Sequence, residues 1–164
     1  MIRLRSAFGP TVPKLATNPA PTASEPIGCS WRDVKEKLHR AGLRPTRQRM
    51  ALGWILFAKA DRHVTAEMLY EEATRAKVTV SLATVYNTLH QFTEVGLLRE
   101  VPVDASKTYF DTNNSIHHHF FIEDKNELMD IPPSEMIVGR TLTPPEGYDI
   151  ARIDVVVRLR PKQG

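Results

Sequence analysis

Three consecutive histidines, His117, His118 and His119, have the clearest capacity for chemistry in this chain. On a strand, successive side chains point to opposite faces, so His117 and His119 share one face and His118 lies on the other. Two imidazoles spaced in this way can bind one metal ion, and imidazole suits zinc, iron, manganese and haem iron alike. The triplet predicts a ligand site without naming its metal, although an exposed polar strand would have the same sequence.

A complete metal site needs donors from other segments of the chain. His63 precedes an expected helix, Asp111 follows an expected hairpin, and Asp130 lies at the end of the strand expected after the histidines. If these segments converge, the donor set contains only nitrogen and oxygen and favours Zn²⁺, Fe²⁺ or Mn²⁺ over thiolate-preferring metals. The candidate metal ligands are therefore His63, Asp111, His117, His119 and Asp130.

A second pattern, from residue 81 to residue 98, reads as a capped helix that runs into a strand. Ser81 is a favourable N-cap and Gly96 a favourable residue just past the helix end. The apolar residues at helical spacing predict one buried stripe, made of Leu82, Val85, Leu89, Phe92 and Val95. The opposite face carries uncharged hydrogen-bonding groups: Ser81, Thr84, Tyr86, Asn87, His90 and Gln91. Such groups suit base edges in a major groove, although an ordinary solvated face has a similar composition.

Charge is distributed unevenly along the 164 residues. Residues 1–110 contain 16 Lys and Arg against 10 Asp and Glu, a net charge of +6, and residues 111–164 contain 6 against 9, a net charge of −3. A basic front half predicts an electrostatic partner such as nucleic acid for that half. The single cysteine, Cys29, excludes an internal disulfide framework and a zinc site with several cysteines.

The elements expected in the front half are helices followed by a hairpin. Helices are predicted over Trp31–Ala41, from Pro45 and Thr46 to residue 57, and over Ala66–Lys77, ahead of the helix that Ser81 caps. Strands at Leu97–Val103 and Thr108–Phe110 then form the hairpin. This order predicts a winged helix-turn-helix.

The rear half is expected to be a small α/β unit, which makes the whole chain α+β. Strands are predicted over Ile116–Ile122, Glu127–Ile131 and Ile150–Leu159, with room for a short helix near Ser134–Val138. A unit of this size is too small to be very stable on its own, so we expect it to dimerise.

We therefore expect three regions. Residues 1–29, which contain five prolines and few large apolar side chains, form a disordered N-terminal tail. Residues 30–111 form the winged-helix DNA-binding domain, and residues 112–164 form the domain for dimerisation and ligand sensing. No apolar run approaches membrane-spanning length and no secretion signal is evident, so we expect a cytoplasmic protein without a membrane partner.

Four segments of the chain resemble the ferric uptake regulator (Fur) family in residue type, order and spacing. They are residues 41–49 (AGLRPTRQR), 63–70 (HVTAEMLY), 82–89 (LATVYNTL), and 108–111 (TYFD) followed by the histidines. The resemblance covers about residues 30–160 and implies a dimeric winged-helix repressor.

The resemblance also implies roles for individual residues. The fourth helix would enter the major groove, with Tyr86 touching thymine methyl groups beside Thr84 and Asn87. Arg44 would reach a minor groove or phosphate, and Arg49 would contact phosphate. The regulatory metal site of the family falls on the same five residues, from His63 to Asp130, that were singled out above.

Two departures from the family pattern point to one branch of it. The paired C-x-x-C zinc site is absent, and Ile153 stands where the last strand usually carries a histidine. Together with the triple histidine, these features resemble the iron response regulator (Irr) branch, which senses haem and binds AT-rich operators. That resemblance implies haem at His117, His118 and His119, and a haem-delivering enzyme as a further partner. Some members bind haem through a Cys-Pro motif, which is Cys29-Ser30 here. Cys29 is therefore either a haem ligand or an incidental thiol.

Three functions compete at this point. The leading hypothesis is a regulator of iron and haem metabolism that haem inactivates. The alternative is a Fur-type repressor that senses Fe²⁺, Mn²⁺ or Zn²⁺ directly. A small metalloenzyme is the third, but it would need a positioned acid or base that the sequence does not offer.

Overall fold

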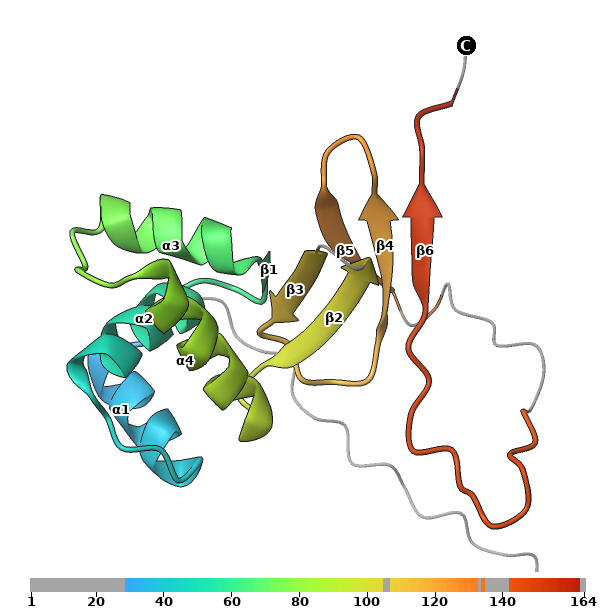
Figure 1. The fold of residues 1–164 in the computed structure, drawn as a ribbon, viewed down its shortest axis with the longest axis horizontal. Coiled ribbons are helices and arrows are strands. Elements are labelled where there is room, and N and C mark those ends of the chain that lie inside the picture. Colours follow the sequence, from blue (N-terminus) through green and yellow to red (C-terminus); the bar gives the residue numbers. More distant parts are fainter. Residues whose placement is uncertain (1–28, 105–106, 133, 135–141, 163–164) are drawn as a thin grey trace, which may run out of the picture.

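The front half of the chain is a bundle of four helices, seen in a computed structural model that describes residues 29–104, 107–132, 134 and 142–162. The helices are α1 (Trp31–Arg40), α2 (Arg47–Phe57), α3 (Ala66–Arg75) and α4 (Leu82–Glu94) (Figure 1). The predicted helices are confirmed to within two residues at each end. Of the expected tail over residues 1–29, all but Cys29 lies outside the described residues.

Each helix begins at a hydroxyl side chain that accepts a hydrogen bond from a backbone N–H of the first turn. These caps are Ser30, Thr46, Thr65 and Ser81. Because the first N–H groups of a helix have no partner within it, such caps fix where each helix starts. The expected stop of α4 is also present, since Gly96 has a φ of 74° that suits glycine.

The buried side chains of the four helices form one core, which Phe110 from the hairpin completes. The inward position predicted for Leu82 is wrong, because this side chain is 36% exposed. In α4 the buried stripe includes Thr88 instead. Its hydroxyl donates to the carbonyl of Thr84, so burial leaves it with a partner.

The hairpin belongs to a three-stranded antiparallel sheet, which we call the wing sheet. It contains β1 (His63–Val64), β2 (Arg99–Asp104) and β3 (Lys107–Asp111) in the order β1-β3-β2. The predicted winged helix-turn-helix is therefore present, with one addition. His63 and Val64, which precede the helix expected at Ala66, form a strand that pairs with the outer edge of β3.

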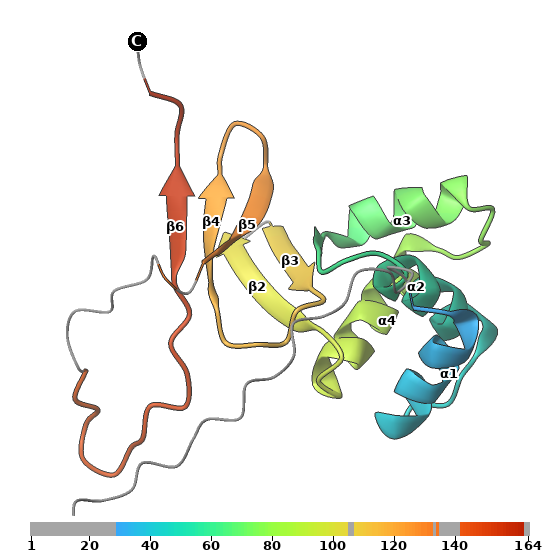
Figure 2. The same ribbon diagram turned by 180° about the vertical axis from the view of Figure 1, so that it is seen from behind.

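A second three-stranded sheet, the rear sheet, lies beside the wing sheet in both views of the fold (Figures 1 and 2). It contains β4 (His118–Ile122), β5 (Glu127–Ile131) and β6 (Val156–Leu159) in the order β5-β4-β6, with β6 parallel to β4. The strand expected over Ile150–Leu159 is shorter than predicted, because its partner β4 begins only at His118. The helix expected near Ser134–Val138 falls almost wholly outside the described residues.

The two sheets share a small core of their own. Val101 and Tyr109 from the wing sheet pack with Phe121 and Leu128 from the rear sheet, and all four are buried. Arg158 of β6 also donates to the carbonyl of Val103 in β2. This shared core holds the facing sides of the two sheets together. In the part of the chain that the structure describes, no helix combines the length and apolarity needed to cross a bilayer.

The stripe of α4 generates a matched stability test. Replacing Leu89, which is fully buried, with Ala should lower the free energy of unfolding by about 2–5 kcal/mol, because it leaves a cavity in the helical core. Leu82→Ala, at the start of the same helix, should cost less than about 1 kcal/mol. Urea denaturation followed by circular dichroism measures both, and equal losses would contradict this packing.

Candidate metal centre

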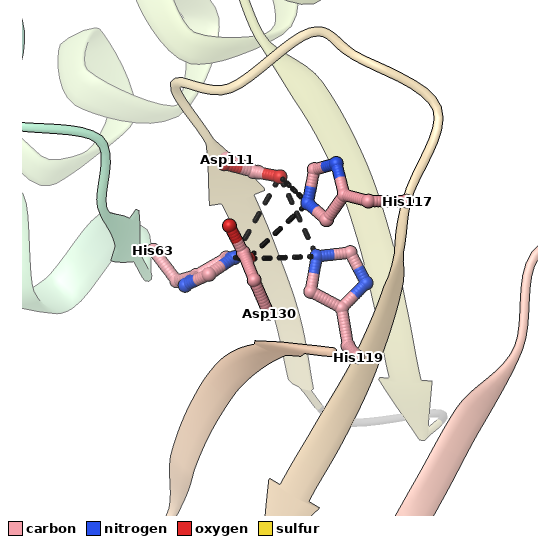
Figure 3. Close-up of side chains that lie close together, drawn as sticks. All are labelled: His63, Asp111, His117, His119 and Asp130. Atoms are coloured by element: carbon pink, nitrogen blue, oxygen red, sulfur yellow. Dashed lines mark hydrogen bonds and ion pairs between the residues drawn. The ribbon is translucent and has the colours of Figure 1, made fainter. Parts of the chain in front are cut away.

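Strand register brings the predicted metal ligands together. His63 in β1 is paired with Asp111 in β3, and His119 in β4 is paired with Asp130 in β5. Side chains of directly paired residues project from the same face of a sheet, so each pair points into the space between the two sheets. His117 lies just before β4, two residues from His119, and joins the same cluster (Figure 3).

The five side chains converge on one point. His117 Nε2 lies 3.0 Å from Asp111 Oδ2, and His63 Nε2 lies 2.9 Å from Asp130 Oδ1. The other nitrogen-to-oxygen contacts of the cluster measure 3.2 to 3.7 Å, and all five candidate donor atoms lie within 4.8 Å of one another. Asp111, His117 and His119 are buried, whereas Asp130 lies at the exposed side of the cluster.

Two of the ring nitrogens that face the centre have no hydrogen-bond partner of suitable direction. These are Nε2 of His63 and Nε2 of His117, both of which are buried. The other ring nitrogen of His117, Nδ1, lies 2.9 Å from the carbonyl oxygen of Ser115. Because a carbonyl can only accept, Nδ1 of a neutral His117 carries the proton, which leaves the lone pair of Nε2 available to a metal ion at the centre.

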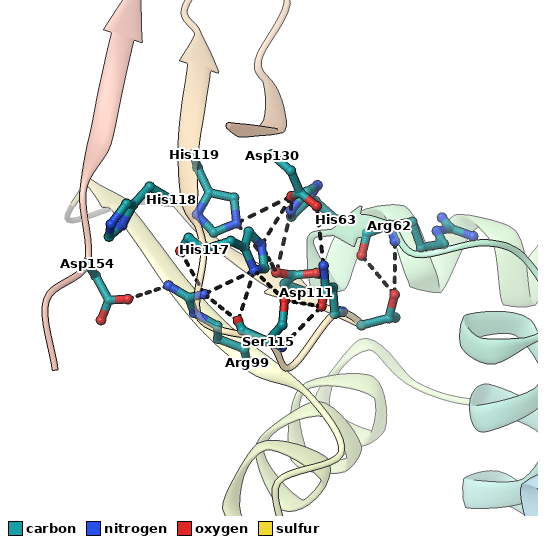
Figure 4. A network of polar contacts seen from close by, with 12 residues as sticks. Arg62, His63, Arg99, Asp111, Ser115, His117, His118, His119, Asp130 and Asp154 are labelled. Atoms are coloured by element: carbon teal, nitrogen blue, oxygen red, sulfur yellow. Dashed lines mark hydrogen bonds and ion pairs between the residues drawn. The ribbon is translucent and has the colours of Figure 1, made fainter. Parts of the chain in front are cut away.

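Arg99 holds this end of the cluster in place. Its guanidinium, buried to 6% exposure, donates to the carbonyls of Ser115 and His117 and forms an ion pair with Asp154 (Figure 4). The loop that carries His117 is therefore fixed at two of its backbone oxygens. Outer contacts of this kind orient the ligands of a metal and are part of a metal site's construction.

Asp111 is fully buried among these imidazoles. Burial acts to raise the pKa of its carboxyl group, but contacts with the rings of His119 and His63 and with the backbone N–H of Asn113 outweigh burial. The net pKa of Asp111 lies well below its ordinary range, so this carboxylate is negatively charged at neutral pH.

The cluster fits the geometry of a divalent transition metal. Metal bonds to imidazole nitrogen and carboxylate oxygen are about 2.0–2.2 Å long, so two donors on one ion lie roughly 3–4 Å apart. The measured contacts of 2.9 to 3.7 Å fall in that range. Three imidazoles and two carboxylates form a donor set that suits zinc, iron and manganese.

A comparison with known proteins assigns this arrangement to a family. A family model described as the ferric uptake regulator family matches residues 40–157, which is more than half of the chain. The chain belongs to the ferric uptake regulator family. Members of this family are DNA-binding regulators of transcription, so the metalloenzyme alternative is set aside.

Individual members of the Fur family are similar to this chain over part of its length. The peroxide-responsive repressor PerR of Staphylococcus saprophyticus is 31% identical over 106 residues, which are 65% of this chain and 71% of that protein. PerR of Staphylococcus epidermidis is 32% identical over 93 residues, 57% of this chain and 61% of that protein. This chain therefore matches less than two thirds of the length of that second relative.

Solved structures of the Fur family share the fold. The ferric uptake regulator of Pseudomonas aeruginosa with manganese gives a TM-score of 0.61 at 26% identity, covering 79% of this chain and 98% of that one. The ferric uptake regulator of Vibrio cholerae gives 0.62 at 19% identity, covering 77% of this chain and 98% of that one. These matches confirm the predicted α+β fold. The family model assigns the family, but not the iron response regulator branch within it.

Of the predicted haem residues, His117 and His119 lie together, whereas His118 and Cys29 lie apart from them. His117 and His119 point into the cluster, whereas His118 lies on the other face of β4 and its Nδ1 accepts from the backbone N–H of Val155. A neutral His118 then carries its proton on Nε2 and has no free lone pair. Cys29 packs on the helical core, and no contact among the described residues joins it to the histidines.

The predicted DNA-binding residues of this Fur-family chain fall into two groups. Ser81, Tyr86 and Asn87 are exposed on α4, and Thr84 is half-buried beside them. Ser81 also caps α4, since its hydroxyl accepts from the backbone N–H of Thr84. The basic residues Arg44 and Arg49 lie at the start of α2 and form the second group.

Arg49 already has partners within the protein. Its guanidinium donates twice to Oε1 of Gln91 in α4, at 2.9 and 3.0 Å, and once to the carbonyl of Arg44. These bonds connect α4 with the loop that precedes α2. The side chain of Arg44 itself is exposed. Contact of Arg49 with phosphate remains a prediction.

Sequence reasoning missed the residues that support the cluster. Arg99 and Ser115 belong to no motif. Their role depends on the bonds from Arg99 to the carbonyls of Ser115 and His117, which lie 16 and 18 residues further along the chain. Arg62 and Glu72 were missed as well, although they form a bidentate pair at 2.5 and 3.0 Å beside His63. The one available signal was an arginine directly before a candidate ligand.

The low pKa of Asp111 predicts part of the acid sensitivity of the metal-free protein. The stabilisation from this carboxylate is present above its unfolded-state pKa of about 3.9 and is lost as pH falls through its lower folded-state pKa. In Asp111→Asn, stability should therefore fall less steeply with pH below about pH 4. Chemical denaturation with chelator present measures this, with the exposed turn residue Asp124→Asn as control. Equal slopes in both variants and wild type would contradict the prediction.

Proposed function

We propose that this protein is a metal-responsive transcription repressor in which Fe²⁺, Mn²⁺ or Zn²⁺ binds His63, Asp111, His117, His119 and Asp130. The observation that carries the proposal is the convergence of these five nitrogen and oxygen donors, two of which are buried Nε2 atoms without a hydrogen bond of suitable direction. The similar protein from P. aeruginosa is described with manganese, which supports a divalent cation.

A metal at this position would act on the arrangement of the two sheets. His63 and Asp111 belong to the wing sheet, which is continuous with the helical bundle, and His119 and Asp130 belong to the rear sheet. When bound, the metal would supply positive charge between the two carboxylates and join the sheets through coordinate bonds. We propose that this fixes the helical bundle relative to the rear domain, which controls how a dimer meets two half-sites.

The DNA-reading element in this proposal is α4. Its exposed residues Ser81, Tyr86 and Asn87, with Thr84, carry hydroxyl, phenol and amide groups that can bond base edges in a major groove. Arg44 and other basic residues would contact phosphate. Dimerisation through the rear sheet follows the pattern of the family, and it would present two copies of α4 to a palindromic operator.

Haem regulation is the second candidate function, and the histidine triplet favours it. Its two outer members line the metal cluster, so haem that took the imidazole of His117 or His119 would dismantle the donor set and release DNA. His118 would have to give up its bond with Val155 to join. This chemistry would make haem and the metal ion competitors for one site.

A matched pair of histidine variants tests the metal proposal. His119→Ala removes a donor, so metal affinity should fall by at least about tenfold, and metal should no longer strengthen operator binding. His118→Ala, on the opposite face of the same strand, should keep both properties. Calorimetric titration with Mn²⁺ and Zn²⁺ and a fluorescence DNA-binding assay measure the two effects.

Equal metal responses in the two variants would refute the assignment of the site. The same DNA assay with haem added separates the two candidate functions, since haem should release DNA from wild type only if the second is right. Because the relatives are peroxide-responsive repressors, Fe²⁺-loaded protein should also be assayed after exposure to hydrogen peroxide.

The assignment of α4 is tested by Tyr86→Ala. Loss of the phenol ring should reduce the preference for operator over random duplex by about tenfold, because base contacts are worth roughly 1–3 kcal/mol each. The salt dependence of binding should stay the same, since no charge is removed. Tyr70→Ala, an exposed tyrosine on α3, serves as control. An unchanged operator preference in Tyr86→Ala would place base reading elsewhere.

A further inference from the structure

Tyr86 on α4 is held by a residue of another helix. Its hydroxyl donates a hydrogen bond of 2.6 Å to Oε1 of Glu67, which lies in the first turn of α3. Both side chains are exposed, so this short bond is formed at the surface where Tyr86 would meet DNA. The pKa of Tyr86 is raised, with the bond to Glu67 as the largest cause, and the pKa of Glu67 is lowered by the same bond.

The tyrosine ring is also supported at its face. It stacks with the ring of His90 at a centroid distance of 6.4 Å and an interplanar angle of 21°, and His90 meets the buried Phe110 edge-on at 5.7 Å. The ring is therefore placed by one contact to α3 and one chain of contacts into the core. A side chain fixed before binding loses less conformational entropy when it meets its target.

The bond to Glu67 determines what the tyrosine hydroxyl can recognise. A phenol has one proton to donate, and here that proton is committed to a carboxylate, so the oxygen offers only lone pairs. Glu67 itself can only accept. In the major groove, adenine N6 and cytosine N4 present donors, whereas guanine O6 and N7 and thymine O4 present acceptors.

Glu67 also differs from its neighbours on α4 because it carries a charge. From Leu82 to Thr93, the sequence of α4 contains no Asp, Glu, Lys or Arg. Glu67 therefore brings a carboxylate to an otherwise uncharged face, although DNA phosphates would repel it. Such a cost in affinity is typical of a residue that selects between partners by penalising the wrong one.

We propose that Glu67 is a specificity-determining residue that makes Tyr86 an acceptor-only reader of the major groove. The Tyr86 hydroxyl then selects a base with an amino group in the major groove, adenine or cytosine, at one position of each half-site and rejects guanine and thymine there, while the ring face stays free to touch a thymine methyl group of a neighbouring base pair. This proposal rests on the proposed function, because it requires α4 to read bases.

The experiment is selection from a randomised duplex pool by the full-length protein, with Mn²⁺ or with chelator, followed by sequencing. Wild type should prefer adenine or cytosine at one position by about tenfold. Glu67→Gln keeps an oxygen to accept from Tyr86 but adds an N–H donor, so the preference at that position should shift toward guanine or thymine. Glu67→Ala should abolish the preference there and bind random duplex several-fold more tightly at low salt.

Glu71→Gln is the matched control, since it removes the same charge one turn further along α3 and should leave every base preference as in wild type. Tyr86→Phe keeps the ring without the hydroxyl and should lose the preference at the same position as Glu67→Ala. All variants change exposed side chains, and equal thermal unfolding curves will show that the fold is retained.

The outcomes separate this proposal from the proposed function. Base preferences in Glu67→Gln and Glu67→Ala that match wild type would overturn the role of Glu67 and leave the metal-responsive repressor standing. A shifted preference that needs no metal would support the role of Glu67 and refute metal control. A wild-type protein that selects no sequence under either condition would overturn both.

Discussion

The pairing of a two-residue strand with the edge of the wing is the constraint on which the rest of the structure depends. β1 consists of His63 and Val64, and its register places His63 across from Asp111. Fully buried Val64 anchors the strand in the helical core. The backbone N–H of Thr112 donates to the carbonyl of Arg62, and the N–H of Arg62 donates to the Thr112 hydroxyl, which extends the pairing by one step. Without this pairing, one of the three imidazoles would not reach the cluster.

The electrostatics of the cluster follow from that geometry. Carboxylates of Asp111 and Asp130 have oxygens within 4.8 Å of each other, and like charges at this separation repel in a partly buried site. The imidazoles oppose this repulsion only through local polar contacts. A divalent cation would oppose both negative charges at once, so the fold holds together a donor set whose charge is best balanced by a ligand. The exposed side of Asp130 offers a route for that ligand to enter.

The sequence was most informative where local patterns decide the structure. Hydroxyl caps such as Ser81 and glycines such as Gly96 fix helix ends through nearby backbone groups, so both were predictable. Alternation along a strand also predicted that His117 and His119 share a face. In contrast, the inward position assigned to Leu82 was wrong, because helical spacing alone does not tell how far the core extends along a helix.

Longer-range contacts were out of reach for the same reason. The convergence of His63, Asp111 and Asp130 depends on strand registers that no local pattern specifies, and here the resemblance to a family supplied what spacing could not. Arg99 gave no signal, since its buried position is set by carbonyls of a loop 16 and 18 residues further along. Partners of this kind are found only when the fold is known.

A second set of contacts connects the candidate metal centre to α4, the helix proposed to face DNA. Arg62, next to His63, forms a two-pronged ion pair with Glu72 of α3, and both side chains are largely buried. Such bidentate pairs are geometrically restrictive, so α3 has to follow the position of β1. Five residues before Glu72 on the same helix, Glu67 holds Tyr86 of α4.

His63 is therefore connected to the tyrosine proposed to read bases through its chain neighbour Arg62, the ion pair of Arg62 with Glu72, the backbone of α3 and the bond from Tyr86 to Glu67. In the proposed function, metal at His63 would favour one position of α3, and with it one position of Glu67 beside Tyr86. Since coupling between two binding sites is reciprocal, DNA that selects this arrangement would in turn increase the affinity for metal by the same factor.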